Sequence, residues 1–178
     1  MKFFQSYLLN ILRYDLIRRF NYSSIKDIAY LKNVVLCFKY RNPSYNQLLN
    51  SLIALELISN SKAKFITSKK PNVSLRIRAG SPVGCKVILT NHKMLNFLSN
   101  LLLFIIPKDK IFKGAFINKR SNNSVNFEFK SLYLFRELSD HYNILKDLTD
   151  LSIVVNTNSK TFSELLFLIR LLKLKCLK

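Results

Sequence analysis

The chain has 178 residues, 49% of them hydrophobic, and carries 29 lysines and arginines against 10 aspartates and glutamates, a formal net charge of +19. This length fits one compact domain, and the apolar fraction excludes a globally disordered chain. A charge of this size favours a polyanionic partner, with nucleic acid as the first choice and an acidic membrane surface as the second.

Charges of the two signs are segregated along the chain. The segment 57–108 has no acidic residue, whereas 137–150 holds four acidic residues and one lysine. A merely solvated surface would mix the signs, so the sequence predicts a directed basic face. The basic residues of the acid-free segment are Lys62, Lys64, Lys69, Lys70, Arg76, Arg78, Lys86, Lys93 and Lys108.

The cysteines and glycines argue against a metal site and a nucleotide loop. Cys37, Cys85 and Cys176 are far apart and form no CxxC motif, so neither a zinc site nor a disulfide framework is expected. Neither GxGxxG nor GxxxxGK[ST] occurs. His92 and His141 lack a serine or cysteine at a spacing typical of catalysis. We therefore expect a non-enzymatic protein that needs no cofactor and no metal.

The first third of the chain predicts a helix, a strand and a second helix. Leucines and isoleucines at helical spacing predict a helix over 3–20, although its basic, acid-poor start could also be an import presequence. The polar segment Asn21–Ser24 ends this helix. A β-rich stretch predicts a strand over 33–40, and Asn42 followed by Pro43 predicts the start of the second helix.

A basic hairpin is expected next. Residues 63–67 are predicted to be a strand, 68–72 a polar turn, and 74–78 a returning strand. Arg76 and Arg78 are two residues apart, so an extended chain would point both to the same side.

The remainder alternates helices and strands. We expect a strand over 83–90, a helix over 94–105 that ends before Pro107, turns at Gly114 and 121–123, and a strand from Val125 to Phe129. A linker or short helix over 140–150 and a strand over 151–157 follow. Thr161 and Glu164 form a capping-box pattern that opens the last helix.

This order predicts an α+β fold, with a mostly antiparallel sheet and helices packed on one face. We expect a single domain, residues 1–178, with an N-terminal helix over 3–20, an α/β core over 21–178 and a protruding basic hairpin loop. Two apolar runs, 94–106 and 162–177, are too short or too interrupted by polar residues to span a membrane and are expected to be buried helices.

The stretch RIRAGSPVGCKVIL, Arg76–Leu89, resembles the signature of the large-subunit ribosomal protein five family, which binds 5S rRNA. In that family a basic strand runs through a G-x-P-x-G-C-K-V pattern into the next strand. FNYSSIKDI, FITSKK and LSIVVNTNSKTFSELLFLI are similar to further family segments. Another segment, ELSDHYNILKDL, looks more like mitochondrial members than bacterial ones. The resemblance covers nearly the whole chain in order.

The resemblance implies a protein of the central protuberance that contacts 5S rRNA or adjacent large-subunit rRNA, the elbow of P-site tRNA and neighbouring ribosomal proteins. It implies a tRNA-contacting loop made of Ser68, Lys69, Lys70, Pro71 and Asn72, and a structural turn made of Gly80, Pro82 and Gly84. The residues expected to bind rRNA are Asn21, Tyr22, Ser23, Ser24, Lys62, Lys64, Arg76, Arg78 and Lys86.

Three positions depart from the family pattern. Cys37 stands where the family usually has asparagine, Lys62 where it has glutamine, and Ile88 where it has threonine. Because the resemblance assigns these polar positions to 5S rRNA contacts, their loss suggests a divergent 5S rRNA or its replacement by other RNA or protein. The region 108–124 also fits the family poorly.

Residue usage indicates the origin of the chain. Its 20 lysines and 18 asparagines, against 5 alanines and 3 glycines, are typical of an AT-rich genome, either of an organelle or of a reduced bacterium. With the mitochondrial resemblance, this favours an organelle-encoded protein of the mitochondrial matrix that is not a homo-oligomer. The alternative is a basic peripheral membrane-surface protein, which requires an amphipathic helix with an exposed apolar stripe.

Overall fold

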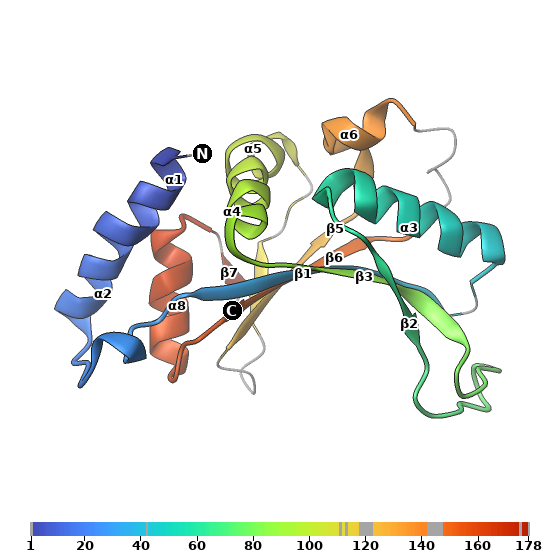
Figure 1. The fold of residues 1–178 in the computed structure, drawn as a ribbon, viewed down its shortest axis with the longest axis horizontal. Coiled ribbons are helices and arrows are strands. Elements are labelled where there is room, and N and C mark those ends of the chain that lie inside the picture. Colours follow the sequence, from blue (N-terminus) through green and yellow to red (C-terminus); the bar gives the residue numbers. More distant parts are fainter. Residues whose placement is uncertain are drawn as a thin grey trace. The chain divides into compact units, whose positions relative to one another are not determined.

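The computed structural model describes residues 2–41, 43–110, 112, 114–117, 123–141, 148–174 and 176–177. Seven strands form one sheet in the order β2-β3-β1-β6-β5-β4-β7 (Figure 1). The chain divides into two compact units: Met1–Val34, Thr90–Phe127 and Val154–Lys178 make the first, and Val35–Leu89 and Glu128–Ile153 the second. The strands β1 (Leu31–Lys39), β5 (Ser124–Phe129) and β6 (Leu151–Thr157) contribute residues to both.

The first unit begins with the expected N-terminal helix. It runs through α1 (Lys2–Tyr7), the π-helical turn η1 (Leu8–Leu12) and α2 (Arg13–Arg19). After the 3-10 turn η2 (Ile25–Asp27), the remaining elements of this unit are α4 (Asn91–Asn100), the π-helical turn η3 (Leu101–Ile105), α5 (Ile106–Lys108), β4 (Ala115–Ile117), α8 (Phe162–Leu171) and β7 (Cys176–Leu177).

Helical and strand periodicity explain the core of this unit. Leu12 and Leu16, four residues apart on the N-terminal helix, pack in one buried cluster with Ile28, Ala29, Leu168 and Leu172. Along β5 the side chains alternate, so that Val125, Phe127 and Phe129 are buried while Asn126 and Glu128 are exposed. Apolar area removed from water in this way is the main stabilising term of the fold.

The second unit places α3 (Tyr45–Ser59) over the hairpin of β2 (Lys64–Thr67) and β3 (Pro82–Leu89), and also holds η4 (Leu132–Leu134) and α6 (Arg136–Ser139) (Figure 1). Strands β2 and β3 pair antiparallel. Cys85, Val87 and Leu89 alternate along β3 and are buried on the α3 side. The Ser51 hydroxyl of α3 donates to the Leu48 carbonyl at 2.8 Å and lies 3.2 Å from the Cys85 thiol.

The start of α3 corrects one prediction. The N-cap is Ser44, whose hydroxyl accepts from the Gln47 amide at 3.3 Å while the Gln47 side chain accepts from the Ser44 amide at 3.0 Å. This reciprocal box satisfies two helix-end donors, which makes Ser44 a stronger start than the predicted Asn42–Pro43 pair. Asn42 itself lies outside the described residues.

The end of the α4 segment also differs from expectation. Pro107 lies inside α5, and the helical path ends one residue later, at Lys108. Proline disrupts the α-helical hydrogen-bond register, but the π-helical turn η3 immediately before it has already left that register. The predicted helical end before Pro107 is therefore wrong.

The remaining elements follow the sequence closely. The α+β class and the mostly antiparallel sheet covered by helices are confirmed, with β7, which pairs parallel to β4, as an unpredicted addition. The single-domain division at residues 20 and 21 stays a prediction. Ser121, Asn122 and residues 142–147 lie outside the described part of the chain. Among the helices that the structure describes, none is long and apolar enough to cross a membrane.

Two glycines of the G-x-P-x-G stretch have different physical roles. Gly80 has φ +82°, a conformation that residues with a Cβ rarely adopt, yet it has open space around it. Gly84 is buried in β3, where an added Cβ would overlap the carbonyl oxygen of Phe38 in β1. Gly80 is thus required by its dihedral angle, and Gly84 by the close approach of two backbones.

We predict that Gly84→Ala destabilises the protein more than Gly80→Ala. The overlap at Gly84 involves strand backbone and cannot be relieved by rotating a side chain, so the cost reaches or exceeds the upper end of the roughly 1–3 kcal/mol typical of overpacking. Alanine at Gly80 costs about 1–2 kcal/mol through its dihedral angle alone. Urea unfolding midpoints of both variants measure this, and an equal or reversed order would contradict the close approach at Phe38.

Candidate nucleic-acid interface

The connection between β2 and β3, Ser68–Ser81, is a folded loop with two hydrogen-bonded rungs. At its base the Ser68 amide donates to the Ser81 carbonyl, and the Gly80 amide to the Ser68 carbonyl, both at 2.9 Å. Further out, Asn72 and Ile77 exchange two backbone hydrogen bonds of 2.9 and 3.0 Å. The chain reverses between them, because the Arg76 amide donates to the Val73 carbonyl at 3.1 Å.

This arrangement corrects the predicted second strand of the basic hairpin. Residues 74–78 form no strand, and Arg76 has φ +52°, the left-handed conformation. The Asn72 side chain favours the reversal, since its oxygen accepts from the Ser74 hydroxyl at 2.6 Å and from the Leu75 amide at 3.3 Å. Arg76 and Arg78 therefore do not share one face of an extended chain, and β2 pairs with β3 instead.

The predicted tRNA-contacting residues form the outer part of this loop. The Ser68 hydroxyl donates to the Lys70 carbonyl at 2.7 Å, which closes a tight turn around Lys69. Lys69, Lys70 and Pro71 are exposed. Asn72 is exposed too, but its side-chain oxygen is occupied by the turn described above. The loop thus presents two lysines from a backbone that its own hydrogen bonds restrain.

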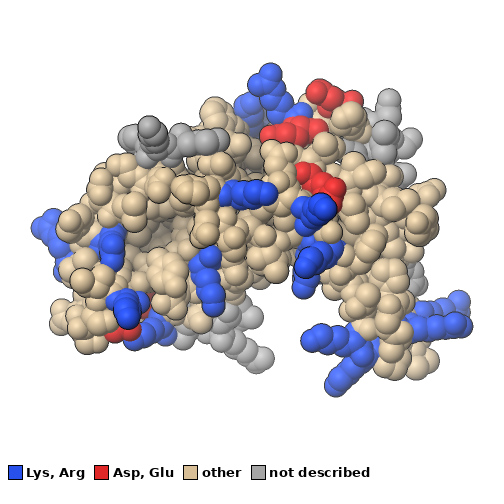
Figure 2. Space-filling model, viewed as in Figure 1, with Lys and Arg blue, Asp and Glu red and all other residues tan. Residues whose placement is uncertain are grey.

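Cations project from this connection without nearby acids. Lys69, Lys70, Arg76 and Arg78 are all exposed, and the segment that carries them contains no acidic residue. Figure 2 shows the lysine and arginine side chains standing out from the loop that joins β2 and β3. Such cations can neutralise phosphates and position a protein on nucleic acid.

The side of the hairpin away from α3 carries a second group of cations. Lys64 and Lys86 lie directly opposite each other in the β2–β3 register, Lys64 exposed and Lys86 half-buried. Like charges in directly opposed positions destabilise a sheet. Lys62, just before β2, is also exposed. An anion bound across this face would remove the repulsion between the two strand lysines.

Two of the departures from the family pattern lie on β1 and β3. Cys37 is buried between Lys39 and Lys86, and burial raises the pKa of its thiol although both lysines and a hydrogen bond with Ser152 oppose the shift. Ile88 leaves 53% of its surface exposed. The positions that the resemblance assigns to polar RNA contacts therefore hold a neutral thiol and an apolar side chain.

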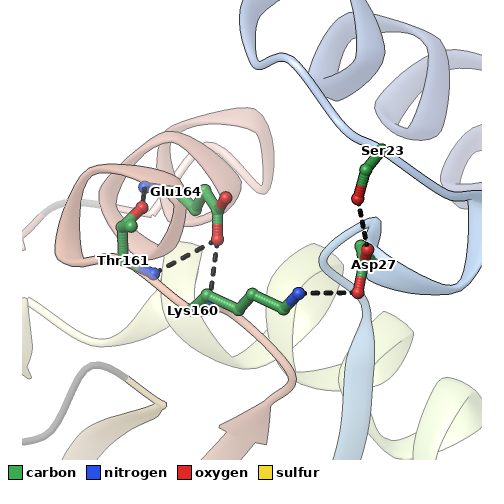
Figure 3. A network of polar contacts seen from close by, with 5 residues as sticks. All are labelled: Ser23, Asp27, Lys160, Thr161 and Glu164. Atoms are coloured by element: carbon green, nitrogen blue, oxygen red, sulfur yellow. Dashed lines mark hydrogen bonds and ion pairs between the residues drawn. The ribbon is translucent and has the colours of Figure 1, made fainter.

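In the first unit, the predicted rRNA-binding segment Asn21–Ser24 is tied to the start of α8 (Figure 3). The Ser23 hydroxyl donates to Asp27 at 3.1 Å, and Lys160 forms an ion pair with the same carboxylate at 2.6 Å. Glu164 accepts from the Lys160 amide at 2.8 Å and from the Thr161 amide at 3.3 Å, which completes the predicted capping box. The network fixes the backbone that carries Asn21 and Ser24, both of which are exposed.

Tyr22 differs from its neighbours in this segment. Its ring is half-buried and lies 6.4 Å from the Phe20 ring, and burial raises the pKa of its hydroxyl. Phe20 in turn packs edge-on against Phe167 of α8. Tyr22 therefore contributes to packing, whereas Asn21, Ser23 and Ser24 form the polar surface of the segment.

The sequence alone missed three cations of these surfaces. Lys39 ends β1 beside Cys37, Arg41 follows it and lines a hollow with the β2–β3 connection, and Lys160 holds the network of Figure 3. Alternation along β1 could have identified Lys39, because it shares the strand face of Cys37. Arg41 and Lys160 depend on contacts between segments distant in sequence.

The described residues offer no catalytic chemistry. Burial raises the pKa of both described cysteine thiols, Cys37 and Cys85, which disfavours the reactive thiolate. Within the described ranges, no three metal-ligating side chains gather into a possible metal site.

The Asp27–Lys160 contact predicts a pH dependence. The hydrogen bond and charge of Lys160, with help from Ser23, hold the pKa of the Asp27 carboxyl below its ordinary value. A depressed folded pKa gives stability that is present above the unfolded pKa of about 4 and is lost as the pH falls through the folded pKa. Melting temperatures measured from pH 7 to pH 3 should therefore fall less steeply for Asp27→Asn than for the wild type.

Asp15→Asn is the control, since Asp15 of α2 makes no ion pair with any other described residue. It should leave the slope unchanged. A slope for Asp27→Asn that matches the wild type would show that the contact with Lys160 does not form in solution.

Comparison with known proteins places the chain in a family. A model of the C-terminal part of the ribosomal protein uL5 family matches residues 82–176. The large ribosomal subunit protein uL5m of Reclinomonas americana is 31% identical, a match that covers 86% of each chain. The large ribosomal subunit protein uL5 of Malacoplasma penetrans is 29% identical, over 88% of this chain and 84% of that protein, and that of Nitrosomonas europaea is 28% identical, over 84% of each. The chain belongs to the uL5 family of ribosomal proteins.

Proposed function

We propose that this protein is a structural constituent of the large subunit of a mitochondrial ribosome. It binds 5S rRNA or adjacent rRNA in the central protuberance and contacts P-site tRNA. Family membership makes it a structural, non-enzymatic ribosomal protein. The observation that carries the proposed RNA contact is the folded, acid-free connection Ser68–Ser81, which presents four exposed cations.

The two cationic groups support different contacts. Lys64 and Lys86 stand opposite each other on the strands of the hairpin and suit a fixed partner such as rRNA, which would relieve their repulsion. Lys69 and Lys70 stand on a restrained turn further along the connection and suit a transient partner such as the tRNA elbow. Pro71 limits the entropy that the turn loses when it binds.

Several parts of the proposal rest on likeness alone. The mitochondrial location follows from the similarity to the uL5m of Reclinomonas americana and from the lysine- and asparagine-rich composition. An organelle-encoded origin follows from the composition. The neighbours are other ribosomal proteins of the central protuberance, and a single copy per particle, rather than a homo-oligomer, is expected.

One observation favours the alternative of a membrane-surface protein. On the N-terminal helix, Ile11, Tyr14 and Ile17 follow one another at spacings of three residues and are 51%, 63% and 46% exposed. Arg13, Arg18 and Arg19 are exposed beside them. An exposed apolar stripe with flanking arginines is the pattern of an interfacial helix.

We predict that RNA binding is strongly salt-dependent. If the interface neutralises on the order of five phosphates, log affinity should fall with log salt with a slope of roughly −3.5 to −4.5. Titrating fluorescent 5S rRNA or large-subunit rRNA fragments with the purified protein from 50 to 400 mM KCl measures the slope.

Vesicles of phosphatidylcholine with phosphatidylserine form the comparison in the same salt series. Binding to RNA that does not respond to salt would contradict the proposal. Tight vesicle binding that Ile17→Ser abolishes, together with weak RNA binding, would favour the membrane alternative instead.

We also predict that Lys69→Ala combined with Lys70→Ala separates tRNA contact from assembly. Both side chains are exposed and lie outside the core, so folding should hardly change. Retention of P-site tRNA by purified ribosomes at 0.15 M salt should drop about fivefold, because counterion release gives each phosphate contact roughly that weight. Occupancy in the large subunit, measured by mass spectrometry, should stay unchanged.

Lys64→Ala combined with Lys86→Ala is the matched control, since it removes the same charge from the strands of the same hairpin. This variant should reduce subunit occupancy and leave tRNA retention on the loaded particles intact. Loss of occupancy in the Lys69/Lys70 variant, with normal tRNA retention on the remaining particles, would make the loop an assembly anchor.

A further inference from the structure

A hollow of about 320 Å³ lies within the second unit, between the end of β1 and the β2–β3 connection. Three arginines from separate segments line it: Arg41 after β1, Arg76 in the reversal of the connection, and Arg78 just beyond the outer rung. Its remaining wall is mostly apolar and includes Ile77, Pro82 and Val83.

Backbone contacts bring the three arginines together. The Tyr40 amide donates to the Val83 carbonyl at 2.9 Å, which holds Arg41 next to the start of β3. The two hydrogen bonds between Asn72 and Ile77 fix the residue between Arg76 and Arg78. The Ser81 amide and hydroxyl donate to the Arg78 carbonyl at 3.2 and 2.7 Å. The roots of the side chains are thus positioned before any ligand arrives.

The charge of the hollow points to an anion. No acidic residue is among its lining residues, and neither Arg76 nor Arg78 makes an ion pair with any residue that the structure describes. Arg76 also keeps an unfavourable left-handed backbone, with φ +52°, to occupy its place. Strained residues held by their surroundings are typical of ligand-binding positions.

The chemistry of the lining selects among anions. The guanidinium group is a planar fork that donates two parallel hydrogen bonds to the oxygens of a phosphate. A free inorganic ion would leave Ile77, Pro82 and Val83 without a contact, whereas the ribose of a nucleotide would pack on them. The three arginines also suit adjoining phosphates of one strand.

We infer that the Arg41–Arg76–Arg78 hollow binds the phosphodiester backbone of RNA, with a ribose on its apolar wall. This inference rests on the proposed function and adds a geometric anchor to it. Arg41 enters the interface only through this hollow. The hollow recognises phosphate geometry, while Lys69 and Lys70 of the same connection act as point charges.

Arginine-to-lysine substitution tests geometry at constant charge. The variant Arg41→Lys/Arg76→Lys/Arg78→Lys keeps every positive charge, so its salt slope should equal that of the wild type while its affinity falls on the order of tenfold. The matched control is Lys69→Arg/Lys70→Arg, which also keeps charge and should bind as the wild type does. The probe is a fluorescent 16-nucleotide single-stranded RNA, and a duplex of the same sequence serves as a second probe.

A second pair of variants removes charge equally from the two places. Arg76→Ala/Arg78→Ala should weaken RNA binding several-fold more than Lys69→Ala/Lys70→Ala, although both lose two cations from one loop. Inorganic phosphate at 20 mM should compete weakly with RNA for the wild type. Thermal melts monitor folding, and since the three arginines are exposed, all variants should melt as the wild type does.

The outcomes separate the inference from the proposed function. Wild-type protein that binds neither RNA probe would overturn the proposed function and this inference with it. Wild-type binding together with equal losses for the Arg76/Arg78 and Lys69/Lys70 alanine pairs, or with unchanged affinity of the triple lysine variant, would overturn the hollow alone. Stronger capture by phosphatidylserine vesicles than by RNA, abolished in the triple lysine variant, would reassign the hollow to lipid phosphate and overturn RNA as its ligand.

Discussion

The close approach of β3 to β1 at Gly84 is the constraint on which the basic surfaces depend. An added Cβ there would overlap the Phe38 carbonyl, so only glycine lets the two strand backbones come this near. One residue earlier, Val83 accepts the Tyr40 amide and stands at the register shift between β2 and β3. The same few atoms therefore set where the Ser68–Ser81 connection begins and where Arg41 lies beside it.

Local sequence rules predicted the elements whose stability is local. The Thr161–Glu164 capping box and the alternation along β5 involve neighbours in sequence, and both were correct. The prediction failed where two local signals competed. LRIR, residues 75–78, alternates as a strand does, but Asn72 offers its side-chain oxygen to the following residues and turns the chain. The start of α3 was misplaced for the same reason, because Ser44 and Gln47 cap each other.

The candidate interface was predictable only as a charge pattern. The acid-free segment 57–108 correctly indicated that cations would gather on the β2–β3 hairpin, because strand pairing keeps residues close in sequence close in space. Arg41 could not be found this way, since its place beside Val83 depends on the pairing of distant strands. The network of Ser23, Asp27 and Lys160 joins residues more than 130 positions apart and left no signal in the sequence.

The departures at Cys37, Lys62 and Ile88 fit this division between geometry and charge. Polar side chains read an RNA through hydrogen bonds that depend on its sequence and shape, whereas cations need only its phosphates. In this chain a buried thiol and an exposed isoleucine replace two polar groups, and a lysine replaces the third. With Lys64 and Lys86 opposite each other nearby, recognition shifts from specific hydrogen bonds toward phosphate neutralisation. Such an interface tolerates an RNA partner whose sequence has diverged, provided that its backbone still follows the β2–β3 hairpin.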